Sequence, residues 1–479
     1  MKKRFIKILC LVLVVTMTVP MLFACKKDDE KVNGDSGAVD TLDGIAGIPQ
    51  QNYGKDFNVY QGNFGVYENY FWSDGVGSSN ISKANYEREL AIEEHLGIEI
   101  YQETYEIKEG GLFAVIEQQS LAGLDDYQVV LTHQYVDLFT LAFSGHLSDI
   151  DELPGVSMNE EYWDISHMEA TEFQGHKYLG SSSFMLHQPT MVMFNKKMAN
   201  SFQDVGEDKM YEHVREKTWT IEQMWTYAKM VDISGNENLR DPIEGTYGYA
   251  AETNWQMNAF PTASGYLHMT RNSQGDYELK NFNETMFNIF REIVVMTDSE
   301  YYYGWDWSKQ DRAIRMSTGR AFFSTVGTEE VITNMANTVD PLGILPYPTL
   351  EKGMDYISLD WSGFFIDPTT VTDKKMVGET LELLSYYGET KIKTEYYDVV
   401  LGLRAADEPQ DSEMLELIFD SMVVEPALAY CNSGGSAISS VFYTIPYMIL
   451  NNQKAMASWY AGCYGNAKKM VDQINGIQE

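Results

Sequence analysis

The stretch from Tyr127 to Pro154, YQVVLTHQYVDLFTLAFSGHLSDIDELP, says most about how this chain folds. Its first five residues, YQVVL, are a short run of β-branched and apolar side chains, as in a buried strand. The following YVDLFTLAFSG, residues 135–145, predicts a short helix on the far side of a polar loop. A buried strand followed at once by a helix is the repeating unit of a parallel sheet that helices cover.

The residues before Tyr127 repeat this order. An alternating strand is predicted at Asp56 to Tyr60, and a helix opens at Ser82 and ends at Gly97. A second strand, Ile98 to Tyr101, and a second helix, Leu112 to Ala122, then lead to YQVVL. The first part of the chain therefore has an α/β pattern.

The later residues continue with mixed elements. Thr220 is a predicted helix cap, with Gln223 three residues on as its partner in a capping box. A polar loop, Ser181 to Gln188, joins two predicted strands. The remaining strands are predicted at Lys177–Leu179, Thr190–Phe194, Arg320–Thr325 and Leu342–Leu345. The remaining helices are predicted at Asn283–Met296, Lys375–Tyr387, Ser412–Val424 and Asn452–Ile474.

Length and charge restrict the class of protein. The chain has 479 residues, too many for one hydrophobic core, so we expect two lobes. The formal net charge of −35 disfavours nucleic acid and anionic membrane surfaces as partners. Besides Cys10 and Cys25 the chain has only Cys431 and Cys463, which is not a disulfide framework. The spacing leaves open whether those two are bridged.

The N-terminus is typical of an exported protein. Four basic residues within the first seven precede an apolar run from Ile8 to Phe23. This run is shorter than the roughly 20 residues of a spanning helix. Leu22-Phe23-Ala24-Cys25 resembles the lipobox of bacterial lipoproteins, although Phe23 replaces the usual small residue. We expect a signal peptide at residues 1–24, lipidation of Cys25 and a flexible tether over residues 25–50. The chain would then be anchored by lipid on the outer face of the cell membrane.

Several segments, in their order along the chain, resemble extracellular solute-binding protein family 1, the receptors of carbohydrate-type ABC importers. They are the segment quoted first, HKYLGSSSFMLHQPTMVMFNKKMA (176–199), TWTIEQMWTYAKMV (218–231), RAIRMSTGRAFFSTVGTEEV (312–331), PLGILPYP (341–348) and YYDVVLGLRAADEPQDSEMLELIFDSM (396–422). The series spans roughly residues 55–475. One departure is GNENLRDPIEGTYGYA (235–250), where many relatives carry a calcium-like loop. Glu237 stands where that loop needs a glycine, and no acidic residue stands at the last position of the loop. We therefore expect no metal there.

The resemblance implies a two-lobed, type II periplasmic-binding-protein-like α/β fold with a ligand cleft between the lobes. The chain would pass between lobes near Ser181 to Phe184 and again near Pro346 to Leu350. Lobe 1 would hold residues 51–182 and 350–415, and lobe 2 would hold residues 183–349 and the C-terminal helices, 416–479. A monomer is expected, with no cofactor, that delivers a solute to ABC permease subunits in the membrane.

A sugar site needs aromatic planes for the ring faces and polar side chains for the hydroxyls. Loops that follow strands at the interlobe edge are the places to look for them. The candidates for ligand binding are Trp72, Asp74, His133, Gln134, Ser183, Phe184, Trp255, Gln256, Thr325, Trp361, Ser362 and Tyr443. The other role open to each aromatic is packing between elements.

Two alternatives to an oligosaccharide receptor stay open. A lipid-anchored hydrolase is one, but the sequence has no G-x-S-x-G elbow and no H-E-x-x-H motif. Carboxylates are too abundant in this chain to indicate a glycosidase. A binding protein for a peptide or a polyamine is the other, since the acidic charge would favour cationic solutes.

Overall fold

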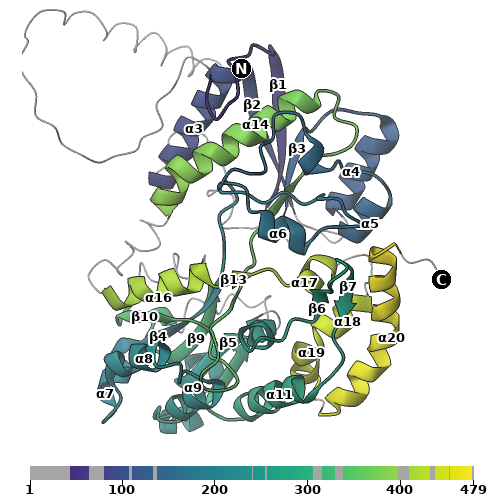
Figure 1. Ribbon diagram of the computed structural model, residues 1–479. Coiled ribbons are helices and arrows are strands. Elements are labelled where there is room, and N and C mark those ends of the chain that lie inside the picture. Colours follow the sequence, from purple (N-terminus) through teal and green to yellow (C-terminus); the bar gives the residue numbers. More distant parts are fainter. Residues whose placement is uncertain are drawn as a thin grey trace, which may run out of the picture. The chain divides into compact units, whose positions relative to one another are not determined.

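Two separate β-sheets, each with its own helices, organise the chain (Figure 1). The structure is a computed structural model, and it describes residues 44–63, 80–106, 111–132, 138–239, 241–253, 256–305, 316–328, 338–396, 409–431, 437–452 and 454–476. The predicted signal peptide, Cys25 and most of the tether lie outside these residues. The chain from Asp43 onward forms one compact unit.

The first sheet has four strands in the order β12-β3-β1-β2. β1 pairs in parallel with both β2 and β3, and β12 pairs antiparallel with β3. The strands are β1 (Lys55–Asn63), β2 (Ile98–Glu106), β3 (Val129–Thr132) and β12 (Phe364–Ile366). The order confirms the predicted strand-helix-strand pattern, since helices connect β1 to β2 and β2 to β3.

The helices grouped with the first sheet lie before β4 and after β12. They are α3 (Asn80–Leu96), α4 (Gly111–Ala122), α5 (Leu138–Phe143), η2 (Ile150–Glu152), α6 (Ile165–Ala170), α14 (Lys374–Tyr387) and η6 (Gly388–Ile392). α14 packs against α3, so a segment that follows β12 covers a helix from the start of the chain (Figure 1).

The second sheet has five strands in the order β10-β4-β9-β5-β8. β5 is parallel to β8 and β9, whereas β4 runs antiparallel to β9 and β10. The strands are β4 (Thr190–Asn195), β5 (Tyr247–Glu252), β8 (Tyr302–Trp305), β9 (Ala321–Gly327) and β10 (Leu342–Leu345). Every residue of β4, β5 and β9 is buried, as in a sheet covered on both faces.

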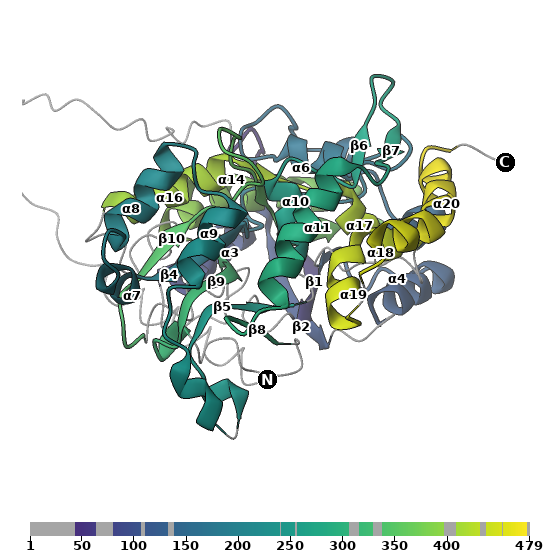
Figure 2. The same cartoon turned by 90° about the horizontal axis from the view of Figure 1, so that it is seen from below.

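Helices cover this sheet, and α9 and α11 lie beside each other over β5 and β8 (Figure 2). Its helices are α7 (Lys196–Ser201), α8 (Gly206–Arg215), α9 (Ile221–Ala228), η3 (Ser234–Asn238), η4 (Pro242–Glu244), η5 (Gln256–Asn258), α10 (Ala259–Ala263), α11 (Glu284–Thr297) and α16 (Pro409–Asp420). The predicted cap at Thr220 is confirmed, because its side chain accepts a hydrogen bond from Gln223 N.

The C-terminal helices pack together beside a small hairpin. They are α17 (Pro426–Cys431), α18 (Ala437–Phe442), α19 (Thr444–Leu450) and α20 (Met456–Ile474), and the hairpin strands are β6 (Met269–Arg271) and β7 (Tyr277–Leu279). Two short strands, β11 (Ser358–Leu359) and β13 (Met422–Val423), form a separate parallel pair. No helix within the described residues is both long and apolar enough to span a membrane.

The second passage between the sheets lies later than expected. Pro346 and Thr349, which were expected in the crossing, both bind Trp219: its indole Nε1 donates to Pro346 O at 3.0 Å and its carbonyl accepts from Thr349 N at 3.2 Å. Trp219 precedes α9, so residues 346–350 stay with the second sheet. The chain returns to the first sheet at residues 360–363, just before β12.

The expected end of lobe 1 at residue 415 falls inside α16. This helix packs against β10 of the second sheet, where buried Asp411 accepts hydrogen bonds from Lys196 Nζ and Ile344 N. Two predicted elements also differ. Lys177–Leu179 forms no strand, and the helix predicted to run to Val424 ends at Asp420, before β13.

Candidate functional site

Two crossing segments run side by side where the chain passes between the sheets. Pro189 and Asp360 form an antiparallel bridge, and Trp361 N donates to Gln188 O at 3.1 Å. Asp360 N in turn donates to the carbonyl of Val423, the last residue of β13, at 3.0 Å. The segments before β4, before β12 and after α16 therefore meet, and they hold Asp360, Trp361 and Ser362 between the two sheets.

One edge of the second sheet collects polar side chains beside this crossing. β5 and β9 are parallel and end at this edge, where antiparallel β4 begins. Gln256 follows β5, and its Oε1 accepts from Thr325 Oγ1 at 2.8 Å and from Glu252 N at 3.0 Å. The structure thus brings together two predicted ligand residues, Gln256 and Thr325, and buries both side chains completely.

Several buried polar atoms near this edge have no hydrogen-bond partner within the part of the chain that the structure describes. Among the residues that the structure describes, no group hydrogen-bonds to Oδ1 or Nδ2 of Asn258, nor to the hydroxyls of Thr190 and Thr262. All three residues are at most 1 % exposed. Leaving a buried amide unpaired costs about 1–3 kcal/mol, so such groups normally have water or a ligand as partner. Asn258 was not among the predicted site residues, although it stands two residues after Gln256.

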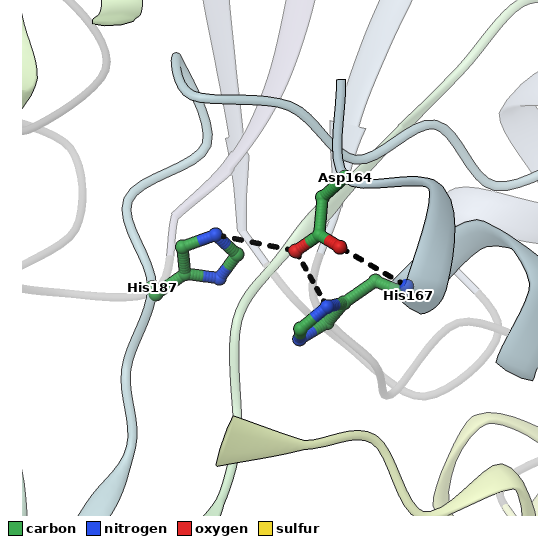
Figure 3. Close-up of side chains that lie close together, drawn as sticks. All are labelled: Asp164, His167 and His187. Atoms are coloured by element: carbon green, nitrogen blue, oxygen red, sulfur yellow. Dashed lines mark hydrogen bonds and ion pairs between the residues drawn. The ribbon is translucent and has the colours of Figure 1, made fainter. Parts of the chain in front are cut away.

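A cluster of two histidines and two carboxylates lies at the crossing. Asp164 caps α6, His167 is in α6, and His187 is in the segment before β4 (Figure 3). Asp164 Oδ2 is 2.5 Å from His167 Nδ1 and 3.3 Å from His187 Nε2. On the other side of both rings, Asp360 Oδ2 is 2.8 Å from His167 Nε2 and 3.2 Å from His187 Nδ1.

Burial and charge act against each other in this cluster. Burial alone would lower the pKa of His167, but the adjacent carboxylates of Asp164 and Asp360 outweigh it and raise the pKa to about 10. Burial would likewise raise the pKa of the carboxyl groups, but the histidines lower that of Asp164 to about 2 and that of Asp360 well below its usual range. His167 is therefore an imidazolium between two carboxylates at neutral pH. None of these three residues was predicted as part of a site.

Ser362 belongs to the same network. Its hydroxyl donates to the Asp360 carboxylate at 2.6 Å and accepts from Gln188 N at 3.1 Å. Trp361, beside it, is 4 % exposed and packs in the hydrophobic core. The indole is thus enclosed by protein, which is the packing role that the sequence left open for each aromatic.

The other predicted site residues are dispersed. Phe184 stacks on Phe365 of β12 with ring centroids 5.1 Å apart, and is part of the core near the first sheet. Ser183 donates to Glu389 in η6. Tyr443 is half-buried and packs edge-on against Phe442. The predicted residues Trp72, Asp74, His133, Gln134 and Trp255 lie outside the described residues.

Two further expectations concern cysteines and calcium. Cys431 and Cys463 are both free thiols, so the bridge left open by the sequence is not formed. In the segment with the calcium-like position, the Asn236 amide binds both the N and the O of Thr246, so this side chain is engaged with the backbone.

A surface pocket of about 510 Å³ lies next to the first sheet. It is lined by residues 147–149 and 152–154, His176, Tyr178 and Lys374. None of the predicted ligand residues contributes to it.

Several solved structures of known proteins share this architecture. An ABC substrate-binding protein from Listeria monocytogenes in complex with cycloalternan matches with a TM-score of 0.58 and 13% identity, covering 88% of this chain and 100% of that one. An ABC transporter solute-binding protein from Thermotoga lettingae, bound with α-D-tagatose, matches with a TM-score of 0.57 and 11% identity, covering 87% and 100%. UgpB from Mycobacterium tuberculosis, in complex with glycerophosphocholine, matches with a TM-score of 0.57 and 14% identity, covering 87% and 98%.

No family model and no curated protein matches the sequence. The structural matches nevertheless extend over nearly all of each relative. They confirm the α/β fold that the sequence predicted, with one sheet in each lobe and crossing segments between them. This chain has the two-lobed, type II periplasmic-binding-protein-like fold of ABC-transporter solute-binding proteins.

Proposed function

We propose that this chain is the receptor of an ABC importer and captures a small polar solute, with a sugar or oligosaccharide as its ligand. The observation that carries the proposal is the set of buried polar groups, Asn258, Thr190 and Thr262, that have no partner within the described residues at the edge of the second sheet. A hydroxyl-rich ligand would supply the hydrogen bonds that these groups lack. Three of the matched proteins were solved in complex with tagatose, cycloalternan or acarbose, which supports this class of ligand.

In this proposal the ligand lies at the crossing, between the two sheets. Gln256, Thr325 and Ser362 contribute polar groups there, and Trp361 forms part of the apolar wall. Ser183 and Tyr443 would line its margins, whereas Phe184 packs in the core. The site would be completed by the predicted residues that lie outside the described ones, Trp72, Asp74, His133, Gln134 and Trp255. Because a ligand favours closure only by binding the closed state better, both lobes must contact it.

A thermal-shift screen of residues 26–479 against mono- and oligosaccharides tests the ligand class. A cognate sugar raises the melting temperature by mass action on the folded state. The same screen includes glycerophosphocholine, the second candidate ligand, because one matched structure was solved with it. If glycerophosphocholine raises the melting temperature and no sugar does, the ligand is not a sugar, but the protein is still a solute receptor.

Binding should proceed without turnover. After incubation with a stabilising glycan, no new reducing ends should be released. If reducing ends are released, and substitution of one carboxylate residue abolishes their release, the protein is a hydrolase and the proposal is wrong. If only peptides or polyamines raise the melting temperature, the protein is a solute receptor for that class of ligand and not for sugars.

The anchoring part of the proposal rests on the sequence around Cys25. The diacylglyceryl group on this residue would hold the receptor on the outer face of the membrane, near its permease. Cys25→Ser should prevent both lipidation and cleavage by the lipoprotein signal peptidase. Labelling of the mutant by radioactive palmitate would show that the anchor is elsewhere.

A further inference from the structure

We propose that Asp164, His167 and His187 form a binding site for one divalent transition-metal ion, with Zn²⁺ as its best fit. Each residue offers one ligand atom, and the three atoms, Asp164 Oδ2, His167 Nδ1 and His187 Nε2, all lie within 4.8 Å of one another. Figure 3 shows both rings turned toward the same carboxylate oxygen. None of the three residues is among the proposed solute ligands, although Ser362, which is one of them, binds Asp360 behind the imidazoles.

Asp164 Oδ2 and His167 Nδ1 form an ion pair 2.5 Å long, so a metal ion would bind His167 by displacing the Nδ1 proton. Metal bonds of about 2.0–2.2 Å separate tetrahedral ligands by roughly 3.3–3.5 Å. The 3.3 Å between Asp164 Oδ2 and His187 Nε2 already fits, and the shorter pair would widen by about 1 Å.

Asp164 is held in place by the start of α6. Its other oxygen, Oδ1, accepts from His167 N at 3.2 Å and from Ser166 Oγ at 2.8 Å. These bonds leave Oδ2 directed at the two imidazoles. The carboxylate is therefore oriented by the backbone before any ion arrives, which lowers the entropic cost of binding.

Asp360 supplies the outer partner that metal-binding histidines normally have. Its Oδ2 contacts the far nitrogen of each ring, His167 Nε2 at 2.8 Å and His187 Nδ1 at 3.2 Å. A carboxylate behind the imidazole fixes the ring orientation and makes the metal-facing nitrogen more basic. Asp360 is itself held by Gln188 N at 2.9 Å and by Ser362. One buried carboxylate thus orients both imidazoles.

The donor set and its exposure indicate the kind of ion. Two imidazoles and one carboxylate suit zinc and its neighbours rather than calcium or magnesium, which prefer oxygen ligands. The side chains of Asp164 and His187 are 19% and 20% exposed, so that solvent reaches the ion position. Three protein ligands with an accessible fourth position match zinc sites that retain a water.

Zinc titration calorimetry of residues 26–479, tag-free and stripped with chelator, tests the site. We expect one Zn²⁺ per chain, with Co²⁺ giving the visible absorption of a tetrahedral site. His187→Ala and Asp164→Asn should each weaken zinc by more than about tenfold, and Asp360→Asn by about 10–100-fold. If His187→Ala does not fold, as judged by circular dichroism, His187→Asn is used in its place.

His176→Ala is the matched control, because His176 Nδ1 also contacts a carboxylate, Asp149 Oδ2 at 2.9 Å, but lies outside the cluster. Its zinc affinity should equal that of the original chain. Absence of stoichiometric zinc binding would overturn the proposal. So would zinc binding that folded His187 variants retain, or that His176→Ala loses.

Discussion

Lys196 Nζ lies 2.7 Å from Asp411 Oδ2, and both side chains are almost completely buried, at 3% and 2% exposed. Lys196 begins α7, directly after β4, and Asp411 lies in the first turn of α16. Asp411 Oδ1 also accepts from Tyr211 OH at 2.6 Å and from Ile344 N at 2.9 Å. One carboxylate therefore ties α16 to three parts of the second lobe, which is why residues 409–420 pack there.

Asp411→Ala should destabilise the fold by about 3–5 kcal/mol, because the buried Lys196 charge would lose the carboxylate that lies 2.7 Å from it. Chemical denaturation measures the change. Glu413→Ala in the same helix is the control: its pair with Arg215 on α8 is 2.6 Å long but half exposed, at 48% and 39%. Such a surface pair contributes about 0–1 kcal/mol. Equal losses in the two variants would contradict the proposed role of Asp411.

Asn258→Leu should weaken solute binding by about tenfold or more while leaving the folded state equally or more stable. The substitution removes a buried amide that has no protein partner within the described residues, so the fold loses no hydrogen bond that the structure shows. The solute would lose the amide's hydrogen bonds. Calorimetry and denaturation of the same variant measure both quantities.

Gln119→Leu is the control for that substitution. Gln119 is also a buried amide, at 4% exposed, but it binds both the N and the O of Tyr127 at 3.1 Å. Its loss should therefore lower stability and leave solute affinity unchanged. The opposite pattern, with Asn258→Leu unfolding the chain and binding normally, would assign Asn258 to the core.

Trp361→Ala should cost about 3–5 kcal/mol of stability, as for other large core residues, because its side chain is 4% exposed. The sequence predicted Trp361 as a ligand-binding residue, and its burial in the core means that its removal must also lower stability. If the folded fraction of the variant binds solute normally, Trp361 has only a packing role.

Cys431 should resist alkylation in the native chain at pH 8. Its thiol is buried, which raises its pKa to about 12, so that little reactive thiolate is present. Mass spectrometry after iodoacetamide treatment, with and without denaturant, measures this. Two modified cysteines in the denatured, unreduced chain of residues 26–479 would confirm free thiols, whereas none would indicate a disulfide.

Local signals in the sequence were sufficient to predict most of the helices and strands. Thr220 with Gln223 marked the start of α9, and the apolar run Thr190–Phe194 marked β4, because both depend on residues adjacent in sequence. The second crossing was misplaced because the bond that keeps Pro346 with the second sheet comes from Trp219, which is remote in sequence.

The candidate site was harder to predict for the same reason. Asp164 and His167 are three residues apart, and this spacing on a helix start was an available signal. Their partner Asp360 lies 193 residues beyond His167. Only the folded chain brings these groups together, and no periodicity or composition indicates it. Asn258 likewise becomes informative only once its burial is known.

The most direct test of the receptor proposal is calorimetric titration of residues 26–479 with the sugar that stabilises it most. We expect saturable binding of one sugar per chain, recovery of the sugar unchanged, and affinity at least about tenfold lower in folded Asn258→Leu. Conversion of the sugar during the titration, or binding that Asn258→Leu leaves intact, would contradict it.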